Sequence, residues 1–184
     1  LAPPFAGLTD PGYIRNYPPG VRENGGQYTH GAIWLARACY RLGRNQEGYE
    51  LLRDLLPETH DAQQYLAEPY VLAGDVSMAD GQLGRGGWSW YTGAAGWYYR
   101  TVQEELLGLT LREGLLTIRP HLPEGWKECH VIWHLPQLEL EITVVRGTLS
   151  GILLDDMPAR EQIDCRQLEG KHRIRVTLPE AESE

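Results

Sequence analysis

Apolar residues gather densely between residues 27 and 42, the first strongly patterned stretch of the chain. They leave few polar positions between them: Ala32, Ile33, Leu35, Ala36, Ala38, Cys39 and Leu42. Such a distribution predicts a helix that is buried on nearly every side. Gly43 follows at the position where helices commonly end in a left-handed residue, so we expect the helix to stop there.

Residues 45–56 show a different helical pattern, with apolar residues on one face and charged or amide residues on the other. The apolar members are Tyr49, Leu51, Leu52, Leu55 and Leu56. This pattern predicts an amphipathic helix with one face in water. Together with the preceding helix it makes an αα-hairpin that has an inner and an outer member. A further short helix is predicted at residues 61–66.

A fourth helix is predicted from about Thr92 to Leu107, closed by Gly108. The residues expected to face inward in this helix are Ala94, Ala95, Trp97, Tyr98, Val102 and Leu106. After Gly108 the apolar period changes to two, in runs at residues 116–118, 131–133, 138–144, 152–154 and 174–178. The sequence therefore predicts an α+β chain, with helices up to residue 108 and a small antiparallel β domain over residues 109–184.

Charge and cysteine content narrow the classes of partner. The formal net charge is −8 and no run of Lys or Arg is present, which argues against nucleic acid or an anionic membrane as partner. The three cysteines form no CxxC pair, so a disulfide framework or a structural zinc site is not expected and a reducing, cytoplasmic compartment fits. No apolar run approaches the roughly 18 residues that span a bilayer. The abrupt opening at Leu1 predicts a piece of a longer protein.

The first group of candidate functional residues lies in a glycine-rich loop that enters the first helix, YPPGVRENGGQYTH at residues 17–30. Glu23 can accept hydrogen bonds from sugar hydroxyls, and His30 can donate to an anion. Glycines in the loop allow the backbone to approach a ligand closely. The alternative is structural, with Asn24 and Gln27 as helix caps and His30 as a satisfied core residue.

The second group is GRGGWSWYTGAAGW at residues 84–97, where a helix is expected to begin at or just after Thr92. Free backbone N–H groups and the helix dipole make such a start suitable for an anion. The small residues Gly93 and Ala94 leave room for it. The alternative is an ordinary Thr cap with close helix packing. A pairing of both helix starts would give an oxyanion pocket, one carboxylate and aromatic walls, to which Trp90 and Tyr91 contribute.

Two other groups of residues are weaker candidates for a functional site. His130 and His134 share a strand face near Cys129, but a third metal ligand is missing, so no metal site is expected. Asp155 and Asp156 are expected to form a turn.

At these motifs the sequence resembles family 94 of the glycoside hydrolases. The likeness is carried by YPPGVRENGGQYTH, EPYVLAGDV, GRGGWSWYTGAAGWYYR and LTLREGLLTIRPHLPEGW, in that order, and it covers residues 3 to about 146. The family contains disaccharide phosphorylases, an oligoglucan phosphorylase and the C-terminal region of cyclic β-1,2-glucan synthases. The GGWSWYTGAA and RENGGQYTH spellings, and Gly74 where the disaccharide enzymes have a phosphate-site Gln, point to the glucan branch.

The resemblance implies a fold and a set of roles. Residues 1–108 would be the last helices of an (α/α)6 catalytic barrel, and residues 109–184 its C-terminal antiparallel β domain. His30, Thr92 and Gly93 would bind phosphate, the co-substrate of an inverting phosphorolysis of β-glucan that needs no metal or organic cofactor. Glu23 would contact the sugar, and Arg22, Trp90 and Tyr91 are expected to join it.

The same resemblance places the general-acid Asp and an Arg of the phosphate site upstream of residue 1, so the chain alone is expected to be inactive. Its expected partners are a β-glucan oligosaccharide, phosphate and the remainder of the barrel, with self-association as a further possibility. Membrane anchoring of the parent enzyme would come from segments outside this chain. Two alternatives stay open: a non-catalytic remnant that binds carbohydrate or is structural, and an inverting hydrolase, which would require a second carboxylate.

Overall fold

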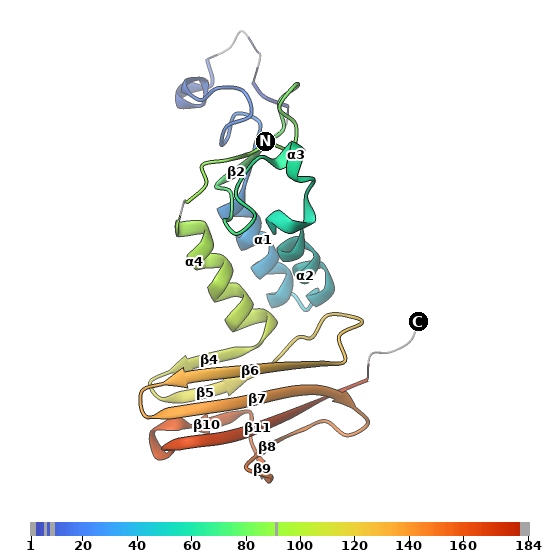
Figure 1. The fold of residues 1–184 in the computed structure, drawn as a ribbon, viewed down its shortest axis with the longest axis vertical. Coiled ribbons are helices and arrows are strands. Elements are labelled where there is room, and N and C mark those ends of the chain that lie inside the picture. Colours follow the sequence, from blue (N-terminus) through green and yellow to red (C-terminus); the bar gives the residue numbers. More distant parts are fainter. Residues whose placement is uncertain (1–2, 6, 8–9, 91, 181–184) are drawn as a thin grey trace. The chain divides into compact units, whose positions relative to one another are not determined.

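The computed structural model of the chain describes residues 3–5, 7, 10–90 and 92–180. It divides into two compact units, Leu1–Thr101 and Val102–Glu184 (Figure 1). The division falls ahead of the expected domain boundary at residue 108, because the π-helical turn η3 (Val102–Leu106) packs on the strand that follows it. The assignment of residues 1–108 and 109–184 to two domains stays a prediction.

The first unit is helical where the periodicity predicts helices. Its helices are η1 (Gly12–Asn16), α1 (Thr29–Arg41), α2 (Asn45–Asp54), η2 (Pro57–Thr59), α3 (Ala62–Tyr65) and α4 (Thr92–Thr101). Gly43 follows α1 with a φ of +76°, as expected of a residue that ends a helix. Asp61 caps α3, since its carboxylate accepts a hydrogen bond from the amide of Gln63.

Helix α1 is buried on one side only, so the prediction of burial on nearly every side is wrong for this structure. Ile33, Ala36, Cys39 and Tyr40 are buried, whereas Leu35 and Leu42 are 56% and 74% exposed. The buried side packs on α2 and α4, and Ile33 joins Leu55 and Ala94 in a small core. The opposite side has no covering element among the described residues of this unit.

Helix α4 begins at Thr92, as predicted, but the α-helical hydrogen bonding ends at Thr101 and gives way to η3. Ala94 and Leu106 are buried and Trp97 and Tyr98 half-buried, in agreement with their expected inward direction. Ala95 is exposed, contrary to expectation, because the chain offers α4 only one packing surface.

A three-stranded antiparallel sheet holds the loops of the first unit together, and the sequence pattern did not predict it. Its strands are β1 (Gly26–Tyr28), β2 (Asp75–Ser77) and β3 (Gly86–Gly87), in the order β1-β2-β3. Tyr28 pairs with Asp75, and Asp75 pairs with Gly87. Three segments far apart in the sequence are thereby brought to the beginning of α1.

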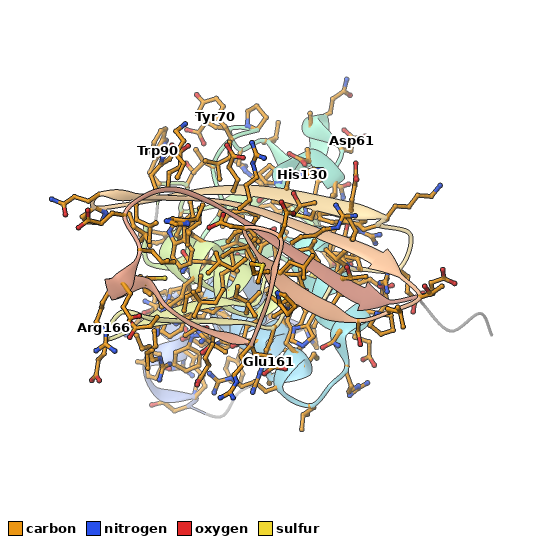
Figure 2. The ribbon with its side chains drawn as sticks, turned by 90° about the horizontal axis from the view of Figure 1, so that it is seen from below. Asp61, Tyr70, Trp90, His130, Glu161 and Arg166 are labelled. Atoms are coloured by element: carbon orange, nitrogen blue, oxygen red, sulfur yellow. The ribbon has the colours of Figure 1, made fainter. Side chains whose placement is uncertain are left out.

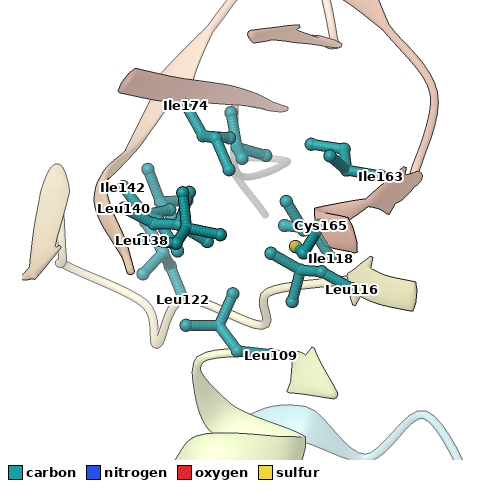
Figure 3. Packing of buried hydrophobic residues seen from close by; sticks show 12 residues of the cluster. Leu109, Leu116, Ile118, Leu122, Leu138, Leu140, Ile142, Ile163, Cys165 and Ile174 are labelled. Atoms are coloured by element: carbon teal, nitrogen blue, oxygen red, sulfur yellow. The ribbon is translucent and has the colours of Figure 1, made fainter. Parts of the chain in front are cut away.

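The second unit is formed by two sheets. One contains β10 (Gln162–Asp164), β5 (Leu115–Ile118) and β4 (Leu109–Arg112) in that order. The other has the order β6-β7-β11-β8-β9, with strands Glu128–Leu135, Leu138–Gly147, Gly170–Pro179, Gly151–Leu154 and Met157–Ala159. Residues from both sheets meet in one core, in which Leu116 and Ile118 lie opposite Leu140, Ile142 and Ile174 (Figure 3). Alternation of buried and exposed residues along the strands accounts for this packing.

The larger sheet is mixed, which corrects the expectation of a purely antiparallel domain. Strand β11 runs parallel to β7 over its full length and antiparallel to β8. A parallel pair needs a long connection, and here the segment between Gly147 and Gly170 supplies it and contains β8, β9, β10 and the 3-10 turn η4 (Cys165–Gln167).

Candidate active site

The glycine-rich loop before α1 is held in place by polar contacts. Asn24 is buried and donates through its amide to the carbonyl of Tyr17 at 2.7 Å, while its Oδ1 accepts from the amide of Phe5 at 2.6 Å. No side chain caps α1, whose first residue follows Tyr28, so Asn24 and Gln27 do not act as helix caps. The loop is therefore held by hydrogen bonds within it and to Phe5, and none of its side chains caps the helix it enters.

Arg22 and Glu23 lie together in this loop, partly exposed. The guanidinium Nε of Arg22 is 3.6 Å from a carboxylate oxygen of Glu23, and its Nη1 donates to the hydroxyl of Tyr17 at 2.9 Å. The same guanidinium lies over the rings of Tyr17 and Tyr28, 5.0 and 5.7 Å from their centroids. A cation held between two aromatic faces is well positioned to contact a polar ligand.

His30 is the second residue of α1, and aromatic rings surround it. Tyr28 stacks on its imidazole at 5.9 Å, Trp34 meets it edge-on at 4.8 Å, and Trp97 of α4 lies at 6.0 Å. Its Nε2 is buried and has no hydrogen-bond partner among the described residues. A buried nitrogen of this kind costs free energy unless a ligand or solvent molecule satisfies it, so a ligand or solvent molecule is expected at this nitrogen.

The beginning of α4 lies on the same side of the first unit as the beginning of α1, since the two helices lie side by side and run in the same direction (Figure 1). Gly93 is the second residue of α4. Apart from its chain neighbours and the backbone of its own helix, no described atom lies within 4 Å of the position that a Cβ would take. The side chain of Thr92 and all of Tyr91 lie outside the described residues.

Two tryptophans precede α4 in left-handed backbone conformations, with φ of +53° at Trp88 and +66° at Trp90. Such values are rare for bulky residues and cost about 1–3 kcal/mol each. Trp90 donates through Nε1 to Glu68 at 2.9 Å and meets Tyr70 edge-on at 6.2 Å. The labels of Trp90 and Tyr70 lie next to each other in Figure 2. Hydrogen bonds from its own amide, Trp90 and Ser89 lower the pKa of Glu68.

Asp75 is a further polar residue near these groups, and sequence reasoning missed it. It is only 3% exposed, and its Oδ2 accepts a hydrogen bond from the amide of Arg22 at 2.8 Å. Burial raises its pKa, while the Arg22 bond and the Arg22 charge act in the opposite direction. The only signal in the sequence was an acidic residue inside the otherwise apolar segment at residues 71–76.

The remaining candidates have ordinary structural explanations. His130 and His134 are exposed on β6, where His134 pairs with Glu139 at 3.0 Å. Asp155 and Asp156 form the turn between β8 and β9, both with positive φ. Within the described residues no group of three His, Cys, Asp or Glu side chains could hold a metal ion, and no helix there is long and apolar enough to span a bilayer.

Comparison of the sequence with known proteins identifies relatives of this chain. Residues 1–108 match the family model described as the glycosyl hydrolase 94 superfamily, catalytic domain. The chain is 51% identical over 147 residues to the cyclic beta-(1,2)-glucan synthase NdvB of Rhizobium meliloti (strain 1021), a match that covers 77% of this chain and 5% of that protein.

Phosphorylases are also similar to the chain. Identity is 31% to the solabiose phosphorylase of Paenibacillus borealis, over 70% of this chain and 17% of the relative. It is 27% to an N,N'-diacetylchitobiose phosphorylase of Vibrio furnissii, over 96% of this chain and 23% of the relative. The chain thus spans less than a quarter of the length of each of these relatives. Since the family model matches more than half of the sequence, the chain belongs to the glycosyl hydrolase 94 superfamily.

Proposed function

We propose that the chain is part of an inverting β-glucan phosphorylase or cyclic β-1,2-glucan synthase and supplies subsites for phosphate and sugar. In this proposal its helices complete an (α/α)6 barrel whose other members belong to a longer protein. Family membership supports a glycoside-processing role. The names of two relatives support phosphorolysis, and the name of a third supports a β-1,2-linked glucan as the substrate.

The observation that carries the phosphate subsite is the approach of His30 to α4. The centroid of the His30 ring lies 6.0 Å from that of Trp97. Trp97 follows Gly93 by four residues, which corresponds to a rise of about 6 Å along the helix. His30 and Gly93 are each the second residue of their helices, and the helices run in the same direction. The buried Nε2 of His30 and the open space at Gly93 support a shared anion.

Phosphate bound in this way would be held by three kinds of donor. The imidazole of His30 donates one hydrogen bond, the hydroxyl of Thr92 donates another, and the unpaired N–H groups at the start of α4 add the helix dipole. Charge-assisted hydrogen bonds are worth about 1.5–3 kcal/mol each. The donors would orient the phosphate and offset its charge as it attacks.

The reaction itself requires one acid from the protein. An oxygen of phosphate attacks the anomeric carbon from the face opposite the glycosidic bond, and that bond breaks with inversion. An Asp from another part of the protein would give its proton to the departing glycosidic oxygen. The products are glucose 1-phosphate and a glucan shortened by one unit. Phosphate is the nucleophile, so no second carboxylate, metal or organic cofactor is needed.

The sugar would be held by side chains around the phosphate subsite. Glu23 would accept hydrogen bonds from hydroxyl groups, with Arg22 beside it as a donor. Trp90 and Tyr91 would supply aromatic surface for the apolar face of a sugar ring. The strained backbone at Trp90 and its hydrogen bond to Glu68 support a fixed orientation for that indole.

Phosphate-dependent formation of glucose 1-phosphate from a β-1,2-linked gluco-oligosaccharide tests the proposal, in the complete protein that carries this sequence. His30→Ala should weaken phosphate use at least about tenfold, because about 1.4 kcal/mol corresponds to a factor of ten. Binding of the oligosaccharide without any phosphorolysis would instead support the second candidate, a non-catalytic carbohydrate-binding piece.

A further inference from the structure

A small pocket lies next to Tyr28, whose ring stacks on His30 of the proposed phosphate subsite. Its walls are Arg22, Tyr28, Gly74, Asp75 and Trp88, which come from the loop before α1, from β1, from β2 and from the segment after β3. Its volume is about 20 Å³. A site for one water molecule needs about 10–15 Å³ on this scale, so the pocket admits a hydroxyl or hydroxymethyl group but not a whole sugar ring.

The polar end of the pocket is the carboxylate of Asp75. Its Oδ2 accepts the amide hydrogen of Arg22 at 2.8 Å, and among the described residues no hydrogen bond to its Oδ1 is found. Oδ1 is not among the buried side-chain atoms that lack a partner, so it is open to solvent or to a ligand group, although Asp75 as a whole is only 3% exposed. A hydroxyl donor is the ligand group that would complete this carboxylate, whereas an anion would be repelled by it.

Trp88 lines the pocket and is 56% exposed. Its φ of +53° is a strained conformation for a bulky residue. Tyrosine and tryptophan rings provide apolar faces on which the apolar face of a sugar ring can lie. A ring resting on Trp88 could therefore insert one of its polar substituents toward Asp75.

Tyr28 connects this pocket with the proposed phosphate subsite. It lines the pocket, and its ring stacks on the imidazole of His30 at a centroid distance of 5.9 Å and an interplanar angle of 28°. A sugar in the pocket would consequently lie next to the group that is proposed to bind phosphate. The separation of one aromatic ring suits a glucosyl unit adjacent to the bond that reacts.

We propose that Asp75 and Trp88 form a glucosyl-binding subsite. Trp88 supports the face of the ring, and Oδ1 of Asp75 accepts a hydrogen bond from a hydroxyl or hydroxymethyl group inserted into the pocket. The position of this subsite beside phosphate rests on the proposed function, whereas its capacity to bind a β-glucan does not.

The test compares Asp75→Asn and Trp88→Leu in the complete protein that carries this sequence, with a β-1,2-linked gluco-oligosaccharide and inorganic phosphate as probes. Asp75→Asn keeps the size of the side chain and an acceptor for the Arg22 amide, so the loop retains its support. Trp88→Tyr keeps an aromatic face. Trp126→Leu, in the second unit, is the control for loss of a tryptophan that does not line the pocket. Circular dichroism establishes that each variant is folded.

We expect the KM for the oligosaccharide to rise at least about tenfold in Asp75→Asn and Trp88→Leu. The KM for phosphate should change by less than about twofold. Trp88→Tyr, which keeps an aromatic face, should raise the KM for the oligosaccharide less than Trp88→Leu does, and Trp126→Leu should stay near the parent values. An unchanged KM for the oligosaccharide in folded Asp75→Asn and Trp88→Leu overturns the subsite. An equal rise in both KM values overturns it also, because it indicates a structural role.

Failure of the subsite proposal can be distinguished from failure of the proposed function. If the parent protein forms no glucose 1-phosphate, the phosphorolysis proposal fails. Calorimetric titration of the same variants with the oligosaccharide then decides the subsite: at least about tenfold weaker binding in Asp75→Asn and Trp88→Leu supports it. Equal binding by all variants, or no binding by the parent protein, overturns it.

Discussion

Asp75 and Arg22 are joined by a hydrogen bond of 2.8 Å from the Arg22 amide to the Asp75 carboxylate, although 53 positions separate them in the sequence. The bond ties β2 to the loop that precedes α1, at a residue whose backbone is left-handed with a φ of +47°. The carboxylate therefore fixes the loop conformation that presents Arg22 and Glu23. It does so while buried, which has a consequence for the pH dependence of stability.

The stability of the Asp75→Asn variant, relative to that of the parent chain, is predicted to increase as pH rises. Burial raises the pKa of Asp75 in the folded state. Stability gained from the protonated form is therefore fully present below the unfolded pKa and is lost as pH rises through the folded pKa. Asparagine does not titrate and accepts the same amide hydrogen. Urea unfolding of both chains, below the ordinary carboxyl pKa and at pH 7, measures the difference.

Asp155→Asn is the matched comparison and should show the opposite trend. Bonds from the Arg173 amide and from His172 lower the pKa of Asp155. The contribution of Asp155 to stability is present above the unfolded pKa and is lost as pH falls through the folded pKa. The stability of Asp155→Asn relative to the parent chain should therefore decrease as pH rises. If the difference in unfolding free energy between Asp75→Asn and the parent chain does not vary with pH, burial does not raise the pKa of Asp75 and the prediction is wrong.

Gly108→Ala is predicted to destabilise the second unit strongly. Gly108 has a φ of +63°, its carbonyl accepts from the amide of Arg119 at 2.8 Å, and an added Cβ would collide with the Arg119 carbonyl. Backbone strain and overpacking together should cost at least about 2 kcal/mol. Gly125→Ala separates the two causes, because its φ is +83° and no atom lies within 4 Å of the added Cβ. Equal losses in the two variants, measured by urea unfolding, would argue against the collision.

The exposed side of α1 is predicted to bind a hydrophobic dye in the 184-residue chain. Leu35, Ala38 and Leu42 lie at helical spacing on one face, and all are exposed. In the proposed function this face packs on other helices of the longer protein. Leu35→Lys combined with Leu42→Lys should lower dye fluorescence and raise the soluble fraction, whereas Leu149→Lys, at an exposed position in the second unit, should not. A monodisperse chain that binds no dye would contradict this prediction.

Helices and long strands could be predicted from the sequence because their burial follows a period. Among the described residues, α1, α2 and α4 and the strands around Leu140 and Ile174 lie where the apolar pattern predicts them. Strand direction could not be predicted, because alternation is the same in parallel and antiparallel pairs, and the β7–β11 pair is parallel. The sheet β1-β2-β3 was missed because its strands have only two or three residues, and β1 and β3 contain glycine.

The candidate site could be predicted only in part. His30 and Gly93 stood out because glycine-rich sequence precedes each helix, and their roles stay predictions. Asp75 has no such context: a lone acidic residue resembles a solvated one until the pairing of Tyr28 with Asp75 is known. The burial of α1 was overestimated because apolar residues do not reveal which covering elements belong to the same chain.

Gly93→Ala, compared with Gly96→Ala in the complete protein that carries this sequence, tests the phosphate subsite most directly. Both glycines lie in α4, and apart from chain neighbours and the helix backbone no described atom is within 4 Å of either added Cβ. Both changes should therefore leave the fold intact and favour the helix by about 1 kcal/mol. Only the methyl group at residue 93 would enter the proposed phosphate position. The measured quantity is the KM for phosphate in glucose 1-phosphate formation. We predict a rise of at least about tenfold in Gly93→Ala and no change in Gly96→Ala; equal KM values for the two variants would contradict the account.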